Sequence, residues 1–391
     1  MEHYQVGIIG AGPIGLEMAV ALQRASVRTV QIEAGAIGST MGWWAPGTKY
    51  FSSPERIAIA GVPLVVEHED KATREDYLRY LRQVVMQFGL DVRTYERVVG
   101  ATRDDDGFVL RTEKSAHGVG GVEEQQRAAR MHADVDGRDG VGPRSVPPRG
   151  MEYRVEKIVL AIGNMHTPRL VGVPGEELPH VSHYLGEPHR YFGQRVVIVG
   201  GRNSAIEAAI RLYRVGAKVT LCQRRLELER DRIKYWLLPE VEWLIKKGQI
   251  GLHAGVGVRE ITERGVVIEP LAGGATGAAG GPRAKARSSE RVEIGADAVL
   301  LLTGYDQNPE LFEMLGVELH SEEHRPRFAR ETMETNVPGV FVAGTATGGS
   351  QQRSKIFIEN SHEHVERIAR AIAGRDVEVR ERAVFEGNEE S

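Results

Sequence analysis

The hydrophobic positions of this chain form short apolar runs that alternate with longer amphipathic segments, a pattern typical of parallel strands joined by helices. Two strand–helix–strand units are predicted from this pattern, and each opens on an apolar strand that ends in glycine. Their elements cover residues 6–10, 14–25 and 28–34 in the first unit, and 195–201, 204–216 and 218–225 in the second. The sequence therefore predicts an α/β protein with two similar βαβ units.

Later apolar runs tell how the two units are connected. One strand is predicted over 157–164, after the first unit, and another over 297–305, after the second; both end in a glycine turn. A further strand over 339–345 is followed by a helix predicted over 355–374. This last pair belongs most simply to the first unit, so we expect the second unit to be inserted within the first.

Two segments have neither periodicity nor enough apolar residues to form a core. Residues 114–150 mix glycine, proline and scattered charge, and residues 272–291 are rich in glycine and alanine. Such segments bury too little apolar surface to offset the entropy of ordering them. We expect both to be disordered inserts, with a partner-binding arm as the alternative.

The turn after the first strand carries the sequence G-A-G-P-I-G. Gly10 permits a tight turn, Gly12 lets the backbone approach a pyrophosphate, and Gly15 allows close packing of the helix on the strand. The helix N-terminus would supply N–H groups and positive dipole to the phosphates. Glu33 closes the next strand, where a carboxylate can accept hydrogen bonds from ribose hydroxyls. This combination predicts a dinucleotide site.

The second turn differs from the first in its charge. It reads Gly200-Gly201-Arg202-Asn203-Ser204-Ala205, with Arg202 in place of the middle glycine. The next strand ends in Arg224 and Arg225 instead of an acid. A carboxylate there would repel a 2′-phosphate, whereas guanidinium groups bind one, so we expect NADPH in preference to NADH. The alternatives are a degenerate turn that binds nothing and a solvated strand end.

Together the turns predict two Rossmann-like dinucleotide-binding domains, with FAD in the first and NADPH in the second. We expect the FAD domain to cover residues 1–189 and 309–391, and the inserted NADPH domain to cover 190–308.

Composition narrows the functional classes. The 391 residues carry a formal charge of −4, and no apolar run is long enough to cross a bilayer, so we expect neither nucleic acid nor a membrane as a partner. The N-terminus has no signal-peptide pattern, which predicts a cytoplasmic protein. The sequence has one cysteine, Cys222, so it cannot form an internal disulfide or a CxxC pair. The scattered histidines predict no metal site, and we expect a homo-oligomer acting on a small molecule.

The chain resembles thioredoxin-reductase-type flavoproteins and, more narrowly, the bacillithiol-disulfide reductase (YpdA-type) family. The resemblance rests on "YFSSPERIAIAGVPL", "HYLGEPHRYFGQRVVIVGGRNSAIEAA", "IKYWLLPEVEWL", "TGYDQNPELFEMLGV", "ETMETNVPGVFVAG" and "KIFIENSHEH". It covers nearly the whole chain outside the two inserts. It implies tightly held FAD, NADPH as the hydride donor and a low-molecular-weight disulfide, such as bacillithiol disulfide, as the acceptor.

The resemblance also implies particular contacts. Residues 42–50 would run along the flavin, with Trp43 and Trp44 shielding it; core packing is the alternative for both. Thr345 would take the place of an aspartate that holds the ribityl chain, and the helix around Lys355 to Phe357 would direct its dipole at the flavin. Beyond the two turns, the positions expected to contact a cofactor are Pro13, Ile14, Gly42, Trp43, Thr48, Val98, Ala161, Gly163, Gly304, Gly344, Thr345 and Ile356.

One position departs from the family pattern. Members proposed to reduce bacillithiol disulfide carry cysteine directly after the proline of the first turn, and this chain has Ile14 there. Isoleucine cannot attack a disulfide, and Cys222 is expected to be a buried structural thiol. No catalytic side chain can therefore be named. We expect an FAD-dependent NADPH oxidoreductase that works without a protein thiol. The alternatives are a flavin monooxygenase, for which His183 or His189 would contact NADP, and a redox-sensing flavoprotein without turnover.

Overall fold

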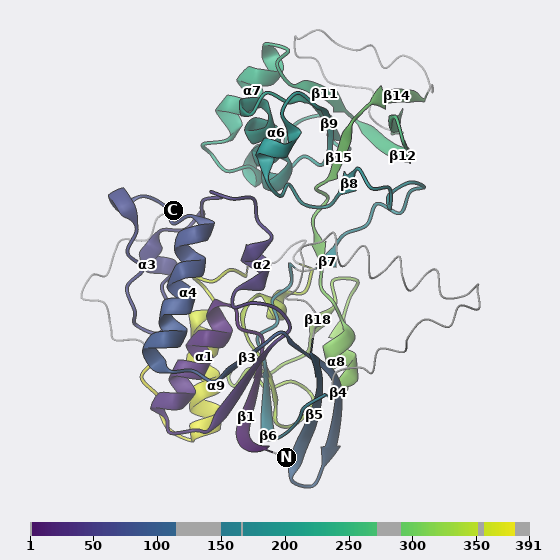
Figure 1. Cartoon of the computed structure of the whole chain (residues 1–391). Helices are drawn as coiled ribbons and strands as arrows, with labels where there is room; N and C mark the ends of the chain where they lie inside the picture. The colour runs from purple at the N-terminus through teal and green to yellow at the C-terminus, as the bar shows by residue number, and fades with distance from the viewer. Residues whose placement is uncertain (1, 115–149, 166, 272–290, 351–355, 380–391) are drawn as a thin grey trace, which may run out of the picture. The chain divides into compact units, whose positions relative to one another are not determined.

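The computed structural model describes residues 2–114, 150–165, 167–271, 291–350 and 356–379 (Figure 1). It divides into two compact units: the first comprises Met1–Gly42, Gly47–Thr167 and Tyr305–Ser391, and the second Trp43–Pro46 and Pro168–Gly304. The predicted insertion of one unit in the other is confirmed. The segments predicted to be disordered lie almost wholly outside the described residues.

The first unit is built on a seven-stranded sheet in the order β3-β2-β1-β6-β5-β4, with β19 also paired to β6. β1, β2, β3, β6 and β19 are joined by parallel pairing, and β4 and β5 are antiparallel to their neighbours. The strands are β1 (Glu2–Ile9), β2 (Thr29–Glu33), β3 (Val92–Thr94), β4 (Glu96–Asp104), β5 (Gly107–Lys114), β6 (Glu152–Leu160) and β19 (Val340–Val342). Because Leu160 is in register with both Ile9 and Val342, three strands end together.

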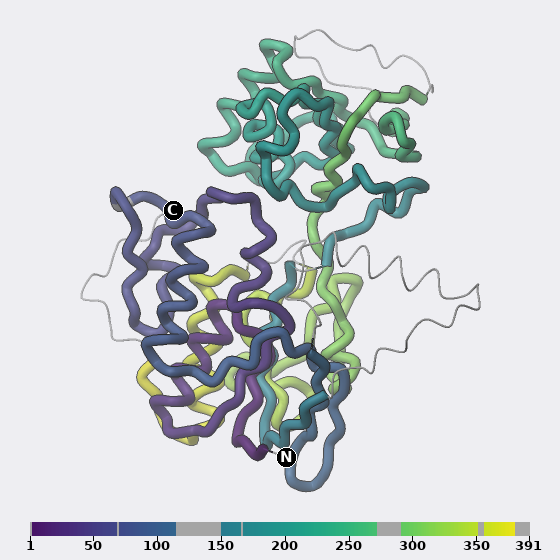
Figure 2. The backbone as a smooth tube through the Cα atoms, in the orientation of Figure 1, coloured from purple at the N-terminus to yellow at the C-terminus, as the bar shows by residue number. Residues whose placement is uncertain are grey.

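Helices α1 (Pro13–Arg24), α4 (Arg74–Phe88) and α9 (His362–Ala373) lie on one side of this sheet (Figure 1). Figure 2 shows α1 and α9, from opposite ends of the chain, side by side, and apolar residues such as Met18 and Val365 join one buried cluster. The N-terminus of α4 is held by a capping box between Thr73 and Asp76. The shorter elements are α2 (Ser39–Gly42), α3 (Pro54–Ile57), η1 (Glu67–Glu69), α8 (Glu310–Met314), β17 (Leu319–His320), β18 (Arg325–Pro326) and η5 (Gly344–Gly348).

The second unit has a parallel five-stranded sheet in the order β11-β10-β9-β15-β8 and an antiparallel sheet β12-β13-β14. The strands are β8 (Val181–Ser182), β9 (Arg195–Val199), β10 (Lys218–Gln223), β11 (Gly251–Ala254), β12 (Val256–Thr262), β13 (Gly265–Pro270), β14 (Val292–Gly295) and β15 (Ala298–Leu301). The helices are η3 (Pro188–Tyr191), α6 (Asn203–Arg214), η4 (Arg230–Arg232) and α7 (Leu238–Lys246). The chain passes between the units at β7 (Thr167–Pro168) and β16 (Tyr305–Asp306).

Two sequence-based boundaries differ from the structure. The second unit begins at Pro168 instead of residue 190, because β8 already pairs with β15 of its sheet, and it ends at Gly304 instead of 308. The last helix begins at His362, not near residue 355. Before it, the Asn360 side chain accepts from the Phe357 backbone N–H at 2.8 Å, and Ser361 donates to the Phe357 carbonyl. These side chains hold a turn in place of a helix.

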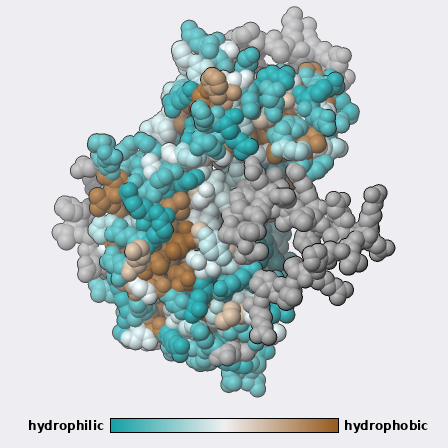
Figure 3. Space-filling model, in the orientation of Figure 1, coloured by the Kyte–Doolittle hydropathy of each residue, from teal (hydrophilic) through white to brown (hydrophobic). Residues whose placement is uncertain are grey.

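The surface seen in Figure 3 is mainly hydrophilic, with apolar residues gathered over part of the first unit. Among the described residues, no helix is both long and apolar enough to span a membrane.

Candidate functional site

The first glycine turn lies where β1 ends and α1 begins, and its glycines have different steric surroundings. Gly10 has φ +106°, and a Cβ on it would lie 2.4 Å from the Ala161 carbonyl oxygen. A Cβ on Gly15 would lie 2.2 Å from the carbonyl oxygen of Gly10. A Cβ on Gly12 would meet no described atom within 4 Å. Gly10 and Gly15 are therefore required by packing, whereas Gly12 leaves an open backbone face at the N-terminus of α1.

Glu33, at the end of β2, supports the turn from within the protein. Its carboxylate accepts from the backbone N–H of Ala11 at 2.7 Å, from that of Gly35 at 2.8 Å and from the Ser39 hydroxyl at 3.1 Å. Burial raises the pKa of Glu33, while these three donors act in the opposite direction. The sequence predicted a ribose ligand at this position; the structure adds a role in holding the glycine turn, which strand-end spacing does not reveal.

Several predicted residues meet at the carboxyl ends of β1, β6 and β19. Ala161 follows β6 and donates its N–H to Ile9 at 2.9 Å. Gly163 has φ +67°, and a Cβ on it would lie 3.8 Å from the Thr345 hydroxyl oxygen. Gly344, with φ +72°, opens η5 beside Thr345. These residues, which come from distant parts of the sequence, thus lie at one edge of the first sheet, the edge where ligands bind in open α/β sheets.

Ile14 points into this region but is part of the hydrophobic core. Its side chain is buried in the cluster that contains Met18 and Val365. A Cβ on Gly344 would lie 3.4 Å from the Cβ of Ile14, so the loop of η5 packs directly against it. The side chain fills space and brings no charge, hydrogen bond or nucleophile to the sheet edge.

Other predicted residues of the first unit have mainly structural contacts. Val98 belongs to the buried cluster of Ile9 and Leu160. The carbonyl of Thr48 accepts from the Arg74 backbone N–H at 2.8 Å, and that of Gly42 accepts from the Arg74 guanidinium at 3.4 Å. Pro13 is the first residue of α1, where proline lacks only an N–H that the helix leaves unpaired.

Trp43 and the three residues after it group with the second unit. The Trp43 ring lies edge-on to that of Tyr184, with 5.8 Å between ring centroids, and Arg211 donates to the Pro46 carbonyl. Flavin shielding by Trp43 and Trp44 therefore stays a prediction. Lys355 lies outside the described residues, whereas Ile356 and Phe357 precede α9 in irregular structure. The prediction that a helix begins around Ile356 and Phe357 and directs its dipole at the flavin is therefore wrong for these two residues.

Two buried amide side chains at the same edge of the first sheet have polar atoms that no described residue pairs. The Asn164 amide donates to the Gly349 carbonyl at 2.6 Å, but its own oxygen has no partner among the described residues. Gln307 is 1% exposed, and neither polar atom of its side chain is paired there. Its backbone N–H donates to Ser350 at 2.9 Å. Sequence reasoning missed both residues, although Asn164 directly follows Gly163 and Gln307 comes three residues after Gly304, which was a usable signal.

Two buried histidines were also missed as part of this region. The backbone N–H of Gly344 donates to Nδ1 of His364 at 3.2 Å, and burial lowers the pKa of His364 to about 4. His362 Nδ1 lies 2.6 Å from Glu17 Oε2, and Glu17 also accepts from the Ala60 N–H at 3.1 Å. No group of three or more potential metal ligands occurs within the described ranges.

The second glycine turn lies between β9 and α6. Gly200 has φ +149°, and its Cβ would lie 2.5 Å from the Leu302 carbonyl oxygen. A Cβ on Gly201 would lie 2.5 Å from Oε1 of Gln223. Gly304, with φ +105°, follows the parallel neighbour β15. As in the first turn, the first glycine has no room for a side chain, because a backbone carbonyl oxygen of the neighbouring strand's end lies beside it.

The charged residues of this turn are arranged differently from the expectation. Arg202, at the N-cap of α6, pairs with Glu229 at 3.3 Å, and Arg225 pairs with the same carboxylate at 3.1 Å. Arg224 is exposed and has no ion pair in the described part of the chain. The Asn203 side chain accepts from the Lys234 N–H at 2.7 Å, while Ser204 is exposed.

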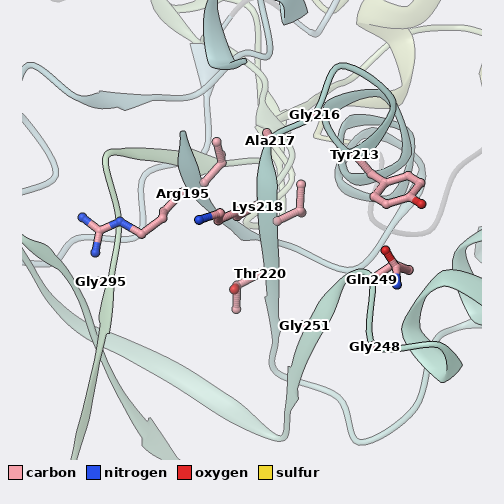
Figure 4. Close-up of a pocket in the computed structure, with 12 residues that line it drawn as sticks. Arg195, Tyr213, Gly216, Ala217, Lys218, Thr220, Gly248, Gln249, Gly251 and Gly295 are labelled. Carbon is pink, nitrogen blue, oxygen red and sulfur yellow. The ribbon is translucent and has the colours of Figure 1, made fainter. Parts of the chain in front are cut away.

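A shallow hollow in the second unit lies away from this turn (Figure 4). Arg195 opens β9, Lys218 opens β10 and Gly251 opens β11, so the hollow lies at the amino ends of the strands. The glycine turn follows the carboxyl end of β9. The hollow is therefore at the opposite edge of the sheet and is not part of the dinucleotide site.

Of the remaining reactive candidates of the second unit, Cys222 and His183 are buried. Cys222 is 1% exposed within β10, so the thiol is buried as predicted, and burial raises its pKa to about 12. His183 lies 3.5 Å from Glu176, and burial lowers its pKa, whereas His189 is exposed on η3.

Two sheets whose central strands are parallel, each with a glycine turn at the carboxyl ends of those strands, define a two-unit dinucleotide-binding oxidoreductase fold. A family model described as pyridine nucleotide-disulphide oxidoreductase matches residues 7–118 and 145–344. The chain belongs to this family and is a flavoprotein oxidoreductase that uses a nicotinamide cofactor.

Individual relatives agree with this assignment. The chain is 33% identical over 370 residues to the bacilliredoxin reductase Bdr of Bacillus subtilis, covering 94% of this chain and 97% of the relative. The structure of bacillithiol disulfide reductase Bdr (YpdA) from Bacillus cereus matches with a TM-score of 0.78 and 32% identity, covering 96% of this chain and all of that one (100%). The Staphylococcus aureus protein of the same description matches with a TM-score of 0.78 and 28% identity, covering 96% and 99%. The predicted resemblance to this group is confirmed.

Proposed function

We propose that the chain is an FAD-dependent NADPH oxidoreductase that reduces a low-molecular-weight disulfide, such as bacillithiol disulfide, or another small acceptor without a thiol of its own. The observation that carries the proposal is the difference in charge between the two turns. The carboxylate of Glu33 is hydrogen-bonded to the first turn, whereas Arg202 and Arg225 lie at the second. The names of the similar proteins, which specify bacilliredoxin and bacillithiol disulfide as substrates of those proteins, support the acceptor class.

The first unit fits FAD by the properties of its own residues. The open face at Gly12 and the uncapped N-terminus of α1 would receive the pyrophosphate, and Glu33 would accept from ribose hydroxyls. Thr345, the Asn164 side-chain oxygen and both polar atoms of the Gln307 side chain offer neutral hydrogen-bonding groups at the same sheet edge; the atoms of Asn164 and Gln307 are unpaired among the described residues. A cofactor bearing hydroxyls and amide-like ring atoms would satisfy these buried polar atoms, which have no partner in the described part of the chain.

The second unit fits a phosphorylated nicotinamide dinucleotide. Arg202, Arg224 and Arg225 lie around the turn where a 2′-phosphate is expected, and their guanidinium groups match phosphate geometry. The N-terminus of α6 has no side-chain cap and offers backbone N–H groups to the pyrophosphate. We assign NADPH to this unit and homo-oligomeric, cytoplasmic action to the enzyme as parts of the same proposal.

A bound flavin supplies the step between a two-electron hydride donor and the acceptor. Overall, NADPH, a proton and the disulfide would give NADP⁺ and two thiols, so the disulfide bond is broken and NADPH is oxidised. The chain's residues make a mixed disulfide with the protein unfavourable: Ile14 has no sulfur, and the thiol of Cys222 is buried and protonated. We infer that the chain's residues bind and orient the cofactors and the acceptor and exclude water from the site.

Anaerobic stopped-flow mixing tests this proposal. NADPH should bleach the bound flavin, and reduced enzyme should then be reoxidised by a disulfide or another small acceptor. A flavin that NADPH does not bleach would contradict the proposal. The Cys222→Ala variant should be reoxidised at the wild-type rate, because the thiol takes no part; a large loss in a folded variant would restore a protein thiol to the mechanism.

A further inference from the structure

Glu229 lies between the guanidinium groups of Arg202, in the second glycine turn, and Arg225, just beyond β10. It belongs to the loop that connects β10 to η4, and its Oε2 atom is 3.3 Å from Nε of Arg202 and 3.1 Å from Nε of Arg225. Arg202 comes from the N-cap of α6, and Arg225 comes from just beyond the end of β10. One carboxylate oxygen therefore joins two elements that both border the turn.

The burial of these side chains shows which of them is enclosed. The Glu229 side chain is 21% exposed, whereas those of Arg202 and Arg225 are 53% and 66% exposed. The arginines thus close over an anion that is more buried than they are. Beside them, Gln223 is 5% exposed, and its Nε2 has no partner among the described residues. Both arginines are positively charged donors, and Gln223 Nε2 is a donor that no described residue pairs.

We propose that Glu229 takes the place of the 2′-phosphate at the second turn when no dinucleotide is bound and is displaced when the phosphate binds, which makes it a specificity-determining residue. The inference rests on the proposed assignment of NADPH to the second unit. A ligand with a 2′-phosphate has to break both ion pairs and meets the repulsion of the carboxylate. A ligand with a 2′-hydroxyl leaves both pairs intact.

The size of the effect follows from the strength of partly exposed ion pairs. Each such pair changes an equilibrium constant by up to about fivefold. The 2′-phosphate still displaces the Glu229 carboxylate from the arginines, because a phosphate carries up to two negative charges and has more acceptor oxygens than a carboxylate. Removing the charge of Glu229 should therefore tighten binding of a 2′-phosphorylated ligand by about three- to twentyfold.

The experiment measures binding to the full-length flavoprotein by calorimetry, with 2′,5′-ADP and 5′-AMP as probes. In Glu229→Gln, the Kd for 2′,5′-ADP should fall about three- to twentyfold, and that for 5′-AMP should change less than about twofold. Glu242→Gln is the matched control, because Glu242 pairs with Arg230 at 2.6 Å in the same unit. It should leave both constants unchanged.

The outcomes separate this inference from the cofactor assignment. If wild type prefers 2′,5′-ADP and Glu229→Gln binds it equally or more weakly, Glu229 positions the arginines and the displacement proposal is wrong. If wild type shows no preference for 2′,5′-ADP, the NADPH assignment fails and the inference falls with it. In Glu229→Gln combined with Arg225→Ala, the gain should be lost. Circular dichroism checks that each variant is folded.

Discussion

At the scale of single residues, the glycine turns show how one residue type serves two purposes. Gly10 and Gly15 have no room for a side chain, because backbone oxygens lie 2.4 and 2.2 Å from where their Cβ atoms would be. A Cβ on Gly12 would meet none of the described residues within 4 Å, so packing in the described part of the chain does not require glycine there. A ligand that approaches the backbone would supply a reason for it.

Replacing these glycines separates folding from cofactor binding. Gly15→Ala should lower the free energy of unfolding by roughly 2 kcal/mol, because the new methyl overlaps a backbone carbonyl. Gly12→Ala should lower it by less than about 1 kcal/mol but release flavin, because the methyl would stand where the pyrophosphate approaches. Urea titration and the flavin absorbance of purified protein measure the two effects. Retention of flavin by Gly12→Ala would contradict the assignment of this turn.

Ile14 is the residue that most restricts the chemistry of the first unit. Ile14→Cys places a thiol at the N-terminus of α1, where the helix dipole lowers a thiol pKa. We expect this variant to reduce bacillithiol disulfide about tenfold or more faster than wild type, because a well-positioned catalytic group commonly accelerates a reaction by at least that factor. Ile14→Val controls for the lost volume. Equal rates in the two variants would point to an acceptor other than a disulfide.

At the scale of elements, α1 and α9 are joined by a polar contact inside an apolar interface. Glu17 is fully buried on α1, and His362 holds it from the first turn of α9. The sequence indicated α1 correctly from its apolar period, but a glutamate on a helix does not reveal its partner 345 positions away. The predicted start of α9 was wrong for a related reason. The side chains of Asn360 and Ser361 form local hydrogen bonds with the backbone of Phe357, and the helix begins only after them.

Breaking the Glu17–His362 pair should weaken the first unit strongly. His362→Ala leaves the Glu17 carboxylate buried with one fewer partner and should lower the free energy of unfolding by about 3 kcal/mol. Glu363→Ala, which removes an exposed pair with Arg367 on the same helix, should lower it by less than about 1 kcal/mol. Denaturant unfolding followed by far-UV circular dichroism compares the two. Similar losses would show that burial gives the His362 pair no special weight.

At the scale of the whole molecule, the sequence was sufficient for the strands and helices that repeat, because both units are built on apolar runs and glycine turns. It was insufficient where contacts join distant segments. The pairing of β8 with β15 moved the unit boundary to Pro168, and Glu229 was not foreseen between two arginines. Neither follows from local pattern, since register and ion pairing depend on where the chain returns.

Buried histidines in both units should make the protein sensitive to mild acid. Burial lowers the pKa of His364 to about 4 from 6.5, and also lowers those of His183 and His253. For His364, between pH 6.5 and about 4, the unfolded chain binds a proton that the folded protein does not, so the free energy of unfolding falls as pH falls through this range. His364 alone accounts for up to about 3 kcal/mol of this loss.

The measurement is denaturant unfolding of wild type and His364→Asn from pH 7.5 to 4.5. The asparagine oxygen can still accept from Gly344, but it does not titrate. The difference in stability between the two proteins should shift in favour of the variant as pH falls below about 6.5. A pH-independent difference would show that His364 is protonated in the folded state as readily as in the unfolded chain.

The division of the first unit into separate stretches of chain has a consequence for biosynthesis. β6 is made early, but β19, which pairs with its second half, and α9, which covers α1, come from residues 340–373. All of Pro168–Gly304 leaves the ribosome before them. Domains generally fold as units during synthesis. The second unit is therefore completely synthesised while the first still lacks β19 and α9. Until they are made, the surface of α1 and the edge of β6 stay exposed, so the N-terminal part of the nascent chain has to be protected from aggregation for longest.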